Sequence, residues 1–379
     1  MKDKQRWVLL LALIVGALAL VAAGCGADDD DGSASELAAP TEEPAAADPA
    51  EEPTAAPGAG IKVGLVTDTG GVNDGGFNQS SIAGLDQAME ELGIEGRVYI
   101  SGSEEDYRPN LLAAAEAGND LVFAIGSQLT AQTIEVATAF PDVSFAGVDQ
   151  FYNTEGDGFS GCEESLTCVV PNALGLQYPS EEAGYLAGIV AAMTTKTGTI
   201  STVGGIAIPR VDSWIAGFQQ GALSVNQNIK LLNAYSQDFV DPAKCKEIGI
   251  DQIALGSDVI FQVAELCGLG ALDAAGEGGA FAIGVEADQS FKGDYVITSA
   301  LKPIAASVFG TISSFVDDDF AGGGNFVFSV VDFPDSALLT DLSADVPEEA
   351  ADAVAVATEQ LISEEIDPTA SVQEVGVTE

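Results

Sequence analysis

The sequence predicts an α/β protein with two doubly wound lobes, each built on a parallel sheet, and a ligand cleft between them. Two observations predict this class. From residue 61 onward, short apolar segments alternate with amphipathic ones, and this alternation occurs in two successive sets. Apolar strands between amphipathic helices indicate a parallel sheet covered on both faces. Polar residues repeatedly follow the apolar segments, which places the cleft at the edge where open α/β sheets bind ligands.

The first segment of the chain predicts export. A basic start is followed by an apolar run over residues 7–23, which ends in Val21-Ala-Ala-Gly-Cys25. This is the layout of a secretory signal, and a small residue before a cysteine resembles a bacterial lipobox. We expect residues 1–24 to be a cleaved signal peptide and Cys25 to be the lipidated N-terminus. An uncleaved anchor helix is the alternative. Both place the protein at the cell membrane, on its extracytoplasmic side.

Residues 25–60 predict a disordered tether. They are rich in Asp, Glu, Ala and Pro and contain no basic residue. Such a segment cannot bury enough apolar surface to offset its ordering entropy, and its like charges extend it. We expect it to hold a folded domain, residues 61–379, away from the bilayer.

The first set of elements forms lobe 1, mainly residues 61–175. We expect its strands at residues 62–67, 98–101, 121–125, 144–148 and 169–174. Helical patterns lie at residues 80–92, 107–117 and 129–140. Pro141 stops the last of them, because proline cannot continue a helix.

The second set forms lobe 2, mainly residues 180–300, and begins with a long helix at residues 180–194. We expect strands at residues 199–204, 231–235, 259–263, 280–285 and 296–300. Further helices are expected at residues 213–225, 242–255, 269–275 and 304–317. Later segments cross between the lobes, and an acidic amphipathic helix at residues 347–366 packs back on one of them.

Charge and composition exclude several kinds of function. The chain of 379 residues has 59 acidic and 13 basic residues, a net charge of −46, and no histidine. Nucleic acids and anionic lipid surfaces would be repelled. Histidine-dependent triads are excluded, as are most zinc sites, and we expect no metal and no cofactor. The acidity suits a saline habitat or simply aids solubility, and the sequence leaves both open.

Four cysteines remain besides Cys25. An even number in an exported chain suggests disulfides. Cys162 and Cys168 flank a short acidic loop and form the natural pair, and Cys245 with Cys267 forms the second. A buried free Cys267 and a four-thiolate zinc site are the alternatives.

The first strand leads into the most informative segment, a wall of the expected cleft. Asp68 ends the strand, and a glycine-rich turn follows that carries Asn73, Phe77 and Asn78. The glycine spacing fits neither a P-loop nor a dinucleotide fingerprint. We therefore expect a carboxylate, side-chain amides and an exposed aromatic ring to contact a ligand, with the glycines leaving room for a flat one.

Other strand ends repeat this pattern in both lobes. Asp149 follows a strand of lobe 1, whereas Glu286 and Lys302 follow strands of lobe 2. A single acid after a strand is usually a helix cap or a solvated turn residue. Several such residues, near Phe77 and Phe261, are better explained by one shared cleft.

In order along the chain, these motifs resemble a known family. They include Val63-Gly-Leu-Val-Thr-Asp68, Phe77-Asn-Gln-Ser80 and Ala282-Ile-Gly-Val-Glu286. The resemblance is to the basic membrane protein, or purine nucleoside receptor-like, lipoproteins. It runs from about residue 61 to 314 and weakens toward the C-terminus. It implies a type I periplasmic-binding-protein fold and a role as the substrate-binding component of an ABC importer, with a nucleoside, preferably a purine, as ligand.

The resemblance also implies roles on the base side of the site. Phe77 stacks on the base, and Phe261 forms the opposite face. Asn78 and Asp149 bond the base edge, with Asp68 close to them. Asn73 belongs to the same motif and is included among the ligand-binding residues.

On the sugar side, the resemblance implies that Glu286 and Lys302 hold the ribose hydroxyls. This chain departs from the family there in two places. Glu286 stands where aspartate is usual, and the turn Ala264-Glu-Leu-Cys267 is bulkier than the family's glycine-rich turn.

The leading hypothesis is thus a lipid-anchored, monomeric receptor, not an enzyme, that closes on a nucleoside and passes it to a membrane permease. A sensor for a signalling receptor and a sugar-binding receptor of the same fold are alternatives. A nucleoside hydrolase working with paired carboxylates is disfavoured, because the acids are spread over both lobes. A purely structural surface protein would leave the strand-end residues without a purpose.

Overall fold

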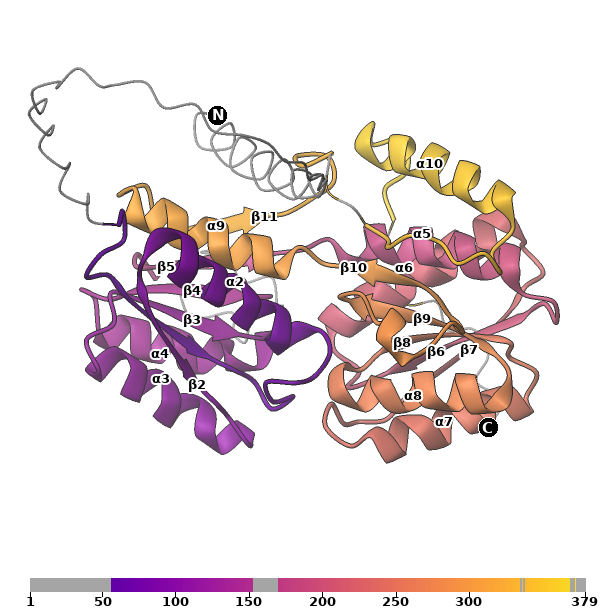
Figure 1. Ribbon diagram of the computed structural model, residues 1–379, viewed down its shortest axis with the longest axis horizontal. Coiled ribbons are helices and arrows are strands. Elements are labelled where there is room, and N and C mark those ends of the chain that lie inside the picture. Colours follow the sequence, from indigo (N-terminus) through magenta and orange to yellow (C-terminus); the bar gives the residue numbers. More distant parts are fainter. Residues whose placement is uncertain (1–55, 153–169, 335, 337, 369–371, 373–379) are drawn as a thin grey trace, which may run out of the picture.

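The structure, a computed structural model, describes residues 56–152, 170–334, 336, 338–368 and 372. Figure 1 shows two lobes beside each other, which we call lobe 1 (indigo and purple) and lobe 2 (pink and orange). The leader, Cys25, most of the tether, Cys162 and Cys168 lie outside the described residues. In the part of the chain that is described, no helix is both long and apolar enough to cross a membrane.

Lobe 1 contains a six-stranded parallel sheet in the order β11-β5-β4-β3-β1-β2. Its central strands are apolar runs buried on both sides, as is usual for parallel sheets. The strands are β1 Lys62–Val66, β2 Glu95–Tyr99, β3 Leu121–Ile125, β4 Ser144–Val148, β5 Ala173–Gln177 and β11 Gly324–Val327.

Helices cover both faces of this sheet. Helices α2 and α9 pack on one face and α3 and α4 on the other, and each pair encloses its own apolar core. The helices are α2 Phe77–Leu92, α3 Tyr107–Glu116, α4 Thr130–Ala139 and α9 Ile304–Val316, with short 3₁₀ turns η1 Glu104–Asp106 and η2 Ser127–Leu129.

Lobe 2 repeats the arrangement with five parallel strands in the order β10-β9-β8-β6-β7. The strands are β6 Thr199–Gly204, β7 Lys230–Tyr235, β8 Val259–Val263, β9 Phe281–Glu286 and β10 Val296–Leu301. Within each lobe the first strand lies between the second and the third. Both lobes therefore have a doubly wound order whose switch point lies beside the first strand.

Four helices sandwich the sheet of lobe 2, and a fifth lies outside them. Helices α5 and α6 cover one face and α7 and α8 the other, while α10 packs on α5. The elements are α5 Ser180–Thr194, α6 Pro209–Val225, α7 Pro242–Ala254, α8 Glu265–Gly278, η3 Ser290–Lys292 and α10 Glu348–Ile362. The α5 and α6 backbones approach closely because Gly188 faces α6, where a β-carbon would lie 2.0 Å from Phe218 O.

The chain crosses between the lobes three times. It passes from β5 to α5, then from β10 to α9, and finally from β11 back to lobe 2 (Figure 1). On its return it lies against β10, where Leu301 N donates to Leu338 O and Thr340 N donates to Ser299 O. Because only these few segments connect the lobes, the lobes can open and close by a hinge movement.

Several helices begin earlier than the sequence predicts. α2 begins at Phe77 and not at residue 80, because the Asp74 carboxylate accepts hydrogen bonds from the backbone N–H groups of Asn78 and Gln79. α6 begins at Pro209, since proline suits the first position of a helix. The short edge strand β11 was not expected, and the strand expected at 169–174 is β5, Ala173–Gln177.

Candidate functional site

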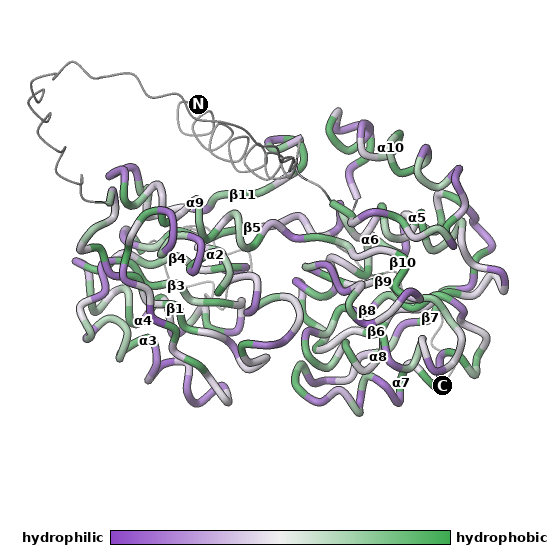
Figure 2. The backbone as a smooth tube through the Cα atoms, in the orientation of Figure 1, coloured by the Kyte–Doolittle hydropathy of each residue, from purple (hydrophilic) through white to green (hydrophobic). Residues whose placement is uncertain are grey.

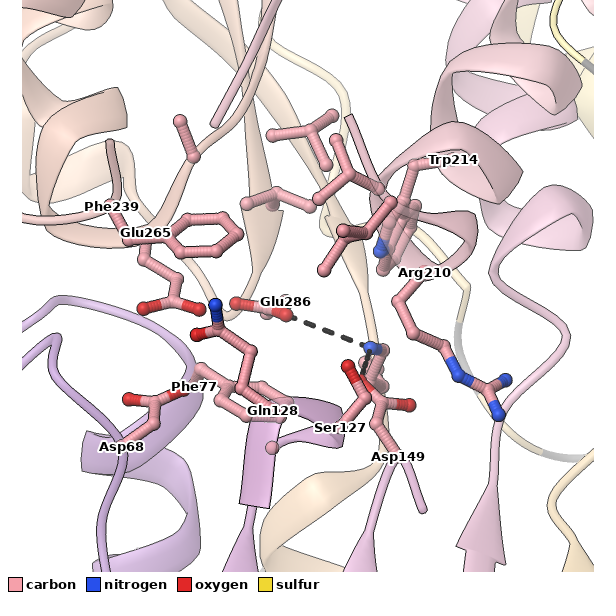
Figure 3. A pocket seen from close by; sticks show the side chains of 17 residues that line it. Asp68, Phe77, Ser127, Gln128, Asp149, Arg210, Trp214, Phe239, Glu265 and Glu286 are labelled. Atoms are coloured by element: carbon pink, nitrogen blue, oxygen red, sulfur yellow. Dashed lines mark hydrogen bonds and ion pairs between the residues drawn. The ribbon is translucent and has the colours of Figure 1, made fainter. Parts of the chain in front are cut away.

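A pocket lies between the lobes at the carboxyl ends of their strands (Figure 3). It contains about 480 Å³ of space not filled by atoms, part of it open to solvent. Figure 2 shows that hydrophilic and hydrophobic segments meet along the facing edges of the two lobes. The lining residues are Asp68, Phe77, Gly126, Ser127, Gln128 and Asp149 from lobe 1, Ile208, Arg210, Val211, Trp214, Phe239, Val263, Ala264, Glu265, Val285 and Glu286 from lobe 2, and Lys302.

Lys302 is the central cation of this pocket. It lies on the second crossover, and its Nζ is 2.7 Å from Asp149 Oδ2 of lobe 1 and 3.6 Å from Glu286 Oε1 of lobe 2. Its side chain is only 2% exposed. The ammonium also lies 5.3 Å from the ring centre of Phe77 and 5.5 Å from that of Trp214, within cation–π range. One lysine thus links the two lobes at the hinge.

Asp149 and Glu286 occupy equivalent positions in the two lobes. Each stands at the end of the fourth strand of its sheet, β4 or β9, and each has a positive φ, 59° and 67° respectively. Such backbone is unfavourable for residues other than glycine and is often found at functional sites. Asp149 Oδ1 and Glu286 Oε2 are buried and accept no hydrogen bond from any described residue. Two free acceptors therefore flank the lysine.

Asp68 faces the other end of the pocket, and Asn78 holds it in place. Asn78 Nδ2 donates to Asp68 Oδ1 at 2.5 Å, while Asp68 N donates to Asn78 Oδ1 at 3.3 Å. Burial raises the pKa of Asp68 to about 7, although the bonds from Asn78 and Gly70 oppose that change. Both ends of the Asn78 amide are engaged with Asp68, so Asn78 positions this carboxyl group. Asn78 does not line the pocket, and its contact with the base edge stays a prediction.

Asp74 organises the glycine-rich turn. Its carboxylate accepts from the N–H groups of Gly76, Asn78 and Gln79, and burial raises its pKa. Asn73, next to it, is exposed and does not line the pocket, because the turn directs it to solvent. The structure thus places Asn73 outside the pocket, and its contact with a ligand stays a prediction.

The glycines of this turn allow it to approach lobe 2. A β-carbon on Gly76 would lie 3.1 Å from Glu286 Oε2, and one on Gly70 would lie 2.7 Å from Glu265 Oε2. Gln289 of lobe 2 also donates to Gly75 O across the gap. These glycines therefore allow close contact between the lobes, whereas the sequence predicted that they make room for a flat ligand.

The aromatic walls differ in part from those expected. Phe77 lines the pocket from lobe 1, as predicted. Phe261 does not line it: its side chain is fully buried in the core of lobe 2, stacked on Phe218. In Figure 3 Phe239 lies across the pocket from Phe77, and Trp214 stands at another side. Phe239 and Trp214 therefore supply the aromatic surface that was assigned to Phe261.

Glu265 is a pocket residue that the strand-end pattern missed. It is the first residue of α8, after Val263 and Ala264, and its backbone has a φ of 50°. Burial raises the pKa of Glu265 well above its usual value, and the carboxylates of Asp68 and Glu286 add to this. Burial likewise raises the pKa of Glu286 to about 8, against the opposing effect of Lys302. The sequence showed Glu265 only as part of a bulkier turn.

Cys245 and Cys267 form a disulfide that joins α7 to α8, with their Cα atoms 5.5 Å apart. Both are fully buried, directly behind the turn that carries Glu265. Among the residues that the structure describes, no group of three or more acidic, cysteine or histidine residues is arranged to hold a metal ion.

Comparison with known proteins agrees with this geometry. Residues 61–333 match the family described as ABC transporter substrate-binding protein PnrA-like. Basic membrane protein A1 of Borrelia garinii subsp. bavariensis is 30% identical over 269 residues, which are 70% of this chain and 76% of that protein. The ABC transporter nucleoside-binding protein BmpA of Lactococcus lactis subsp. cremoris is 28% identical over 84% of this chain and 86% of that protein.

A solved structure supports the fold directly. An ABC transporter solute-binding protein from Aeropyrum pernix K1 superposes with a TM-score of 0.72 at 22% identity, over 83% of this chain and 94% of that chain. This likeness confirms the predicted two-lobed type I periplasmic-binding fold.

Proposed function

We propose, from the premise that this chain belongs to the PnrA-like family of ABC transporter substrate-binding proteins, that it captures a purine nucleoside between its lobes for import. The family is one of substrate-binding proteins and not of enzymes. The Lactococcus lactis relative is named as nucleoside-binding. That name supports the nucleoside class, and the chemistry of the pocket supports it independently.

The observation that carries the proposal is the pair of free carboxylate oxygens beside Lys302. Asp149 Oδ1 and Glu286 Oε2 are buried acceptors without a donor among the described residues. Two neighbouring hydroxyl groups of a ribose would supply both donors, and Lys302 Nζ would donate to a hydroxyl oxygen in return. Charge-assisted hydrogen bonds of this kind are shorter and stronger than neutral ones.

The aromatic walls support a flat ligand next to this ribose site. Phe77 of lobe 1 and Phe239 of lobe 2 lie on opposite sides of the pocket (Figure 3). A base stacked between them would gain about 1–3 kcal/mol from the stacking, with little dependence on which base it is. The base would then point toward Asp68 and Glu265, and the ribose toward Lys302.

Closure of the lobes completes the site in this proposal. Lys302 lies in the segment that crosses from β10 to α9 and contacts an acid of each lobe. Arg210 Nη2 of lobe 2 donates to Gln177 Oε1 of lobe 1 at 2.5 Å, and Gln289 donates to Gly75 O. Ligand bound to both lobes would shift the equilibrium toward this closed arrangement.

We further propose that the protein acts outside the cytoplasm as a lipid-anchored monomer. The signal-like leader, the Cys25 lipobox and the acidic tether support this placement. The anchored receptor would deliver its ligand to an ABC permease in the same membrane.

Binding measurements with nucleoside analogues test the proposal. Removing both ribose hydroxyls leaves the two buried acceptors unpaired, so 2′,3′-dideoxyadenosine should bind at least about tenfold more weakly than adenosine. Adenosine 5′-monophosphate should also bind weakly, because its charged phosphate would enter a pocket lined by four carboxyl groups, and further ionisation of those groups would oppose its binding. Equal binding of adenosine and its dideoxy analogue would contradict the assignment of the diol site. Release of free adenine on incubation would favour a hydrolase instead.

A further inference from the structure

Glu265 is an acid of lobe 2 that lines the pocket. It begins α8 at a positive φ, which turns its side chain into the pocket beside Phe239 (Figure 3). Its Oε2 atom is buried and has no hydrogen-bond partner among the residues described. A buried, unpaired carboxylate oxygen is costly, so its retention indicates that something outside the chain supplies the donor.

A second carboxyl group meets Glu265 from the opposite lobe. A β-carbon placed on Gly70 would lie 2.7 Å from Glu265 Oε2 and 3.5 Å from Asp68 Oδ1, so both carboxyls border one point. Asp68 is fixed there by Asn78 and by the N–H of Gly70. Two acceptors, one from each lobe, therefore face the base end of the pocket.

We propose that the Asp68–Glu265 pair selects nucleosides whose base carries an exocyclic amino group. This inference rests on the proposed nucleoside function. An amino group has two N–H donors and no strong acceptor, so it can donate one hydrogen to each lobe. The same contact that recognises the base thus holds the lobes together.

The pair discriminates against a base that lacks this group. A hydrogen in place of the amine leaves Glu265 Oε2 without a donor and removes one donor from Asp68, whose Oδ1 still accepts from Asn78 Nδ2 and Gly70 N. A site built to bond a polar group strongly rejects an analogue that lacks it, because the site's own buried groups are then unpaired.

Two matched pairs of nucleosides test the inference in the full-length protein by titration calorimetry. Guanosine differs from inosine only by its 2-amino group, and adenosine differs from purine riboside only by its 6-amino group. In the wild type we expect the amino compound of at least one pair to bind at least about tenfold more tightly. In Glu265→Ala that ratio should fall to about threefold or less, and Glu265→Gln, which keeps one neutral acceptor, should be intermediate.

Glu277→Ala is the matched control, since Glu277 is on the same helix, exposed, and paired with Lys246. It should keep the wild-type ratio. Equal binding within both pairs, or a wild-type ratio that survives in both Glu265 variants, overturns the inference. If none of the four compounds binds, the nucleoside function itself fails, which is a different result from equal binding.

Discussion

Replacing Lys302 by methionine is the perturbation with the largest expected effect on the ligand-free protein. The side chain keeps most of its length and loses its charge, leaving Asp149 and Glu286 without their shared partner. Removing one member of a buried ion pair typically costs about 3–5 kcal/mol of folding free energy. The matched control is Lys246→Met, whose pair with Glu277 has the same 2.7 Å length but lies at the surface. That pair should contribute at most about 1 kcal/mol.

The pH dependence of this loss identifies its cause. Burial raises the pKa of Glu286 to about 8 against the opposing effect of Lys302, so this pKa should rise further when the lysine is removed. Glu286 is then protonated at pH 5 in both proteins and ionises at a higher pH in the variant than in the wild type. The difference in unfolding free energy between wild type and Lys302→Met should therefore be larger above pH 8 than at pH 5. Urea unfolding followed by circular dichroism measures this difference. A loss no larger than that of Lys246→Met, or one that does not change with pH, would refute the reasoning.

Three further predictions concern Phe77, the buried acids of the pocket and the disulfide. Phe77→Ala should raise the dissociation constant for a nucleoside by roughly tenfold to a hundredfold, the value of one stacked base, and unchanged affinity in calorimetry would remove Phe77 from the site. The ligand-free protein should lose stability as the pH rises from about 4 to 8, because Asp68 and Glu286 have folded-state pKa values, about 7 and about 8, above those of the unfolded chain. In Asp68→Asn, thermal unfolding should show a stability that depends less on pH in the lower part of this range. A wild-type stability that rises over the range would contradict both pKa directions. Reducing the Cys245–Cys267 disulfide should lower stability by about 2–4 kcal/mol, and an unchanged urea midpoint would show that the bond does not contribute.

The fold could be predicted because most strands are apolar runs between amphipathic helices, although β2 and β7 also carry polar residues. Strand ends then located Asp68, Asp149 and Glu286 at the pocket without knowledge of the structure, since parallel strands present their carboxyl ends at one edge. β11 could not be predicted in this way, because its four residues, Gly324–Val327, are only partly apolar and lie at the sheet edge.

Side-chain partners were the harder part to predict. Phe261 lies on a strand that is buried on both faces, so its position did not reveal whether it faces the core or the cleft. The Asn78 amide can both donate and accept hydrogen bonds, but the sequence does not show that Asp68 is its partner in both. The position of the Glu265 side chain in the pocket depends on a positive φ at the start of a helix, and a sequence pattern does not show this φ.

The central claim is that the two lobes close on a nucleoside, with the base between aromatic rings and the ribose on Lys302. A calorimetric comparison of purine nucleosides, their free bases and monosaccharides tests it most directly. We predict tight binding of a whole nucleoside and much weaker binding of the base or of any monosaccharide. A monosaccharide that binds tightly while every nucleoside fails to bind would contradict the account and favour a sugar receptor of the same fold.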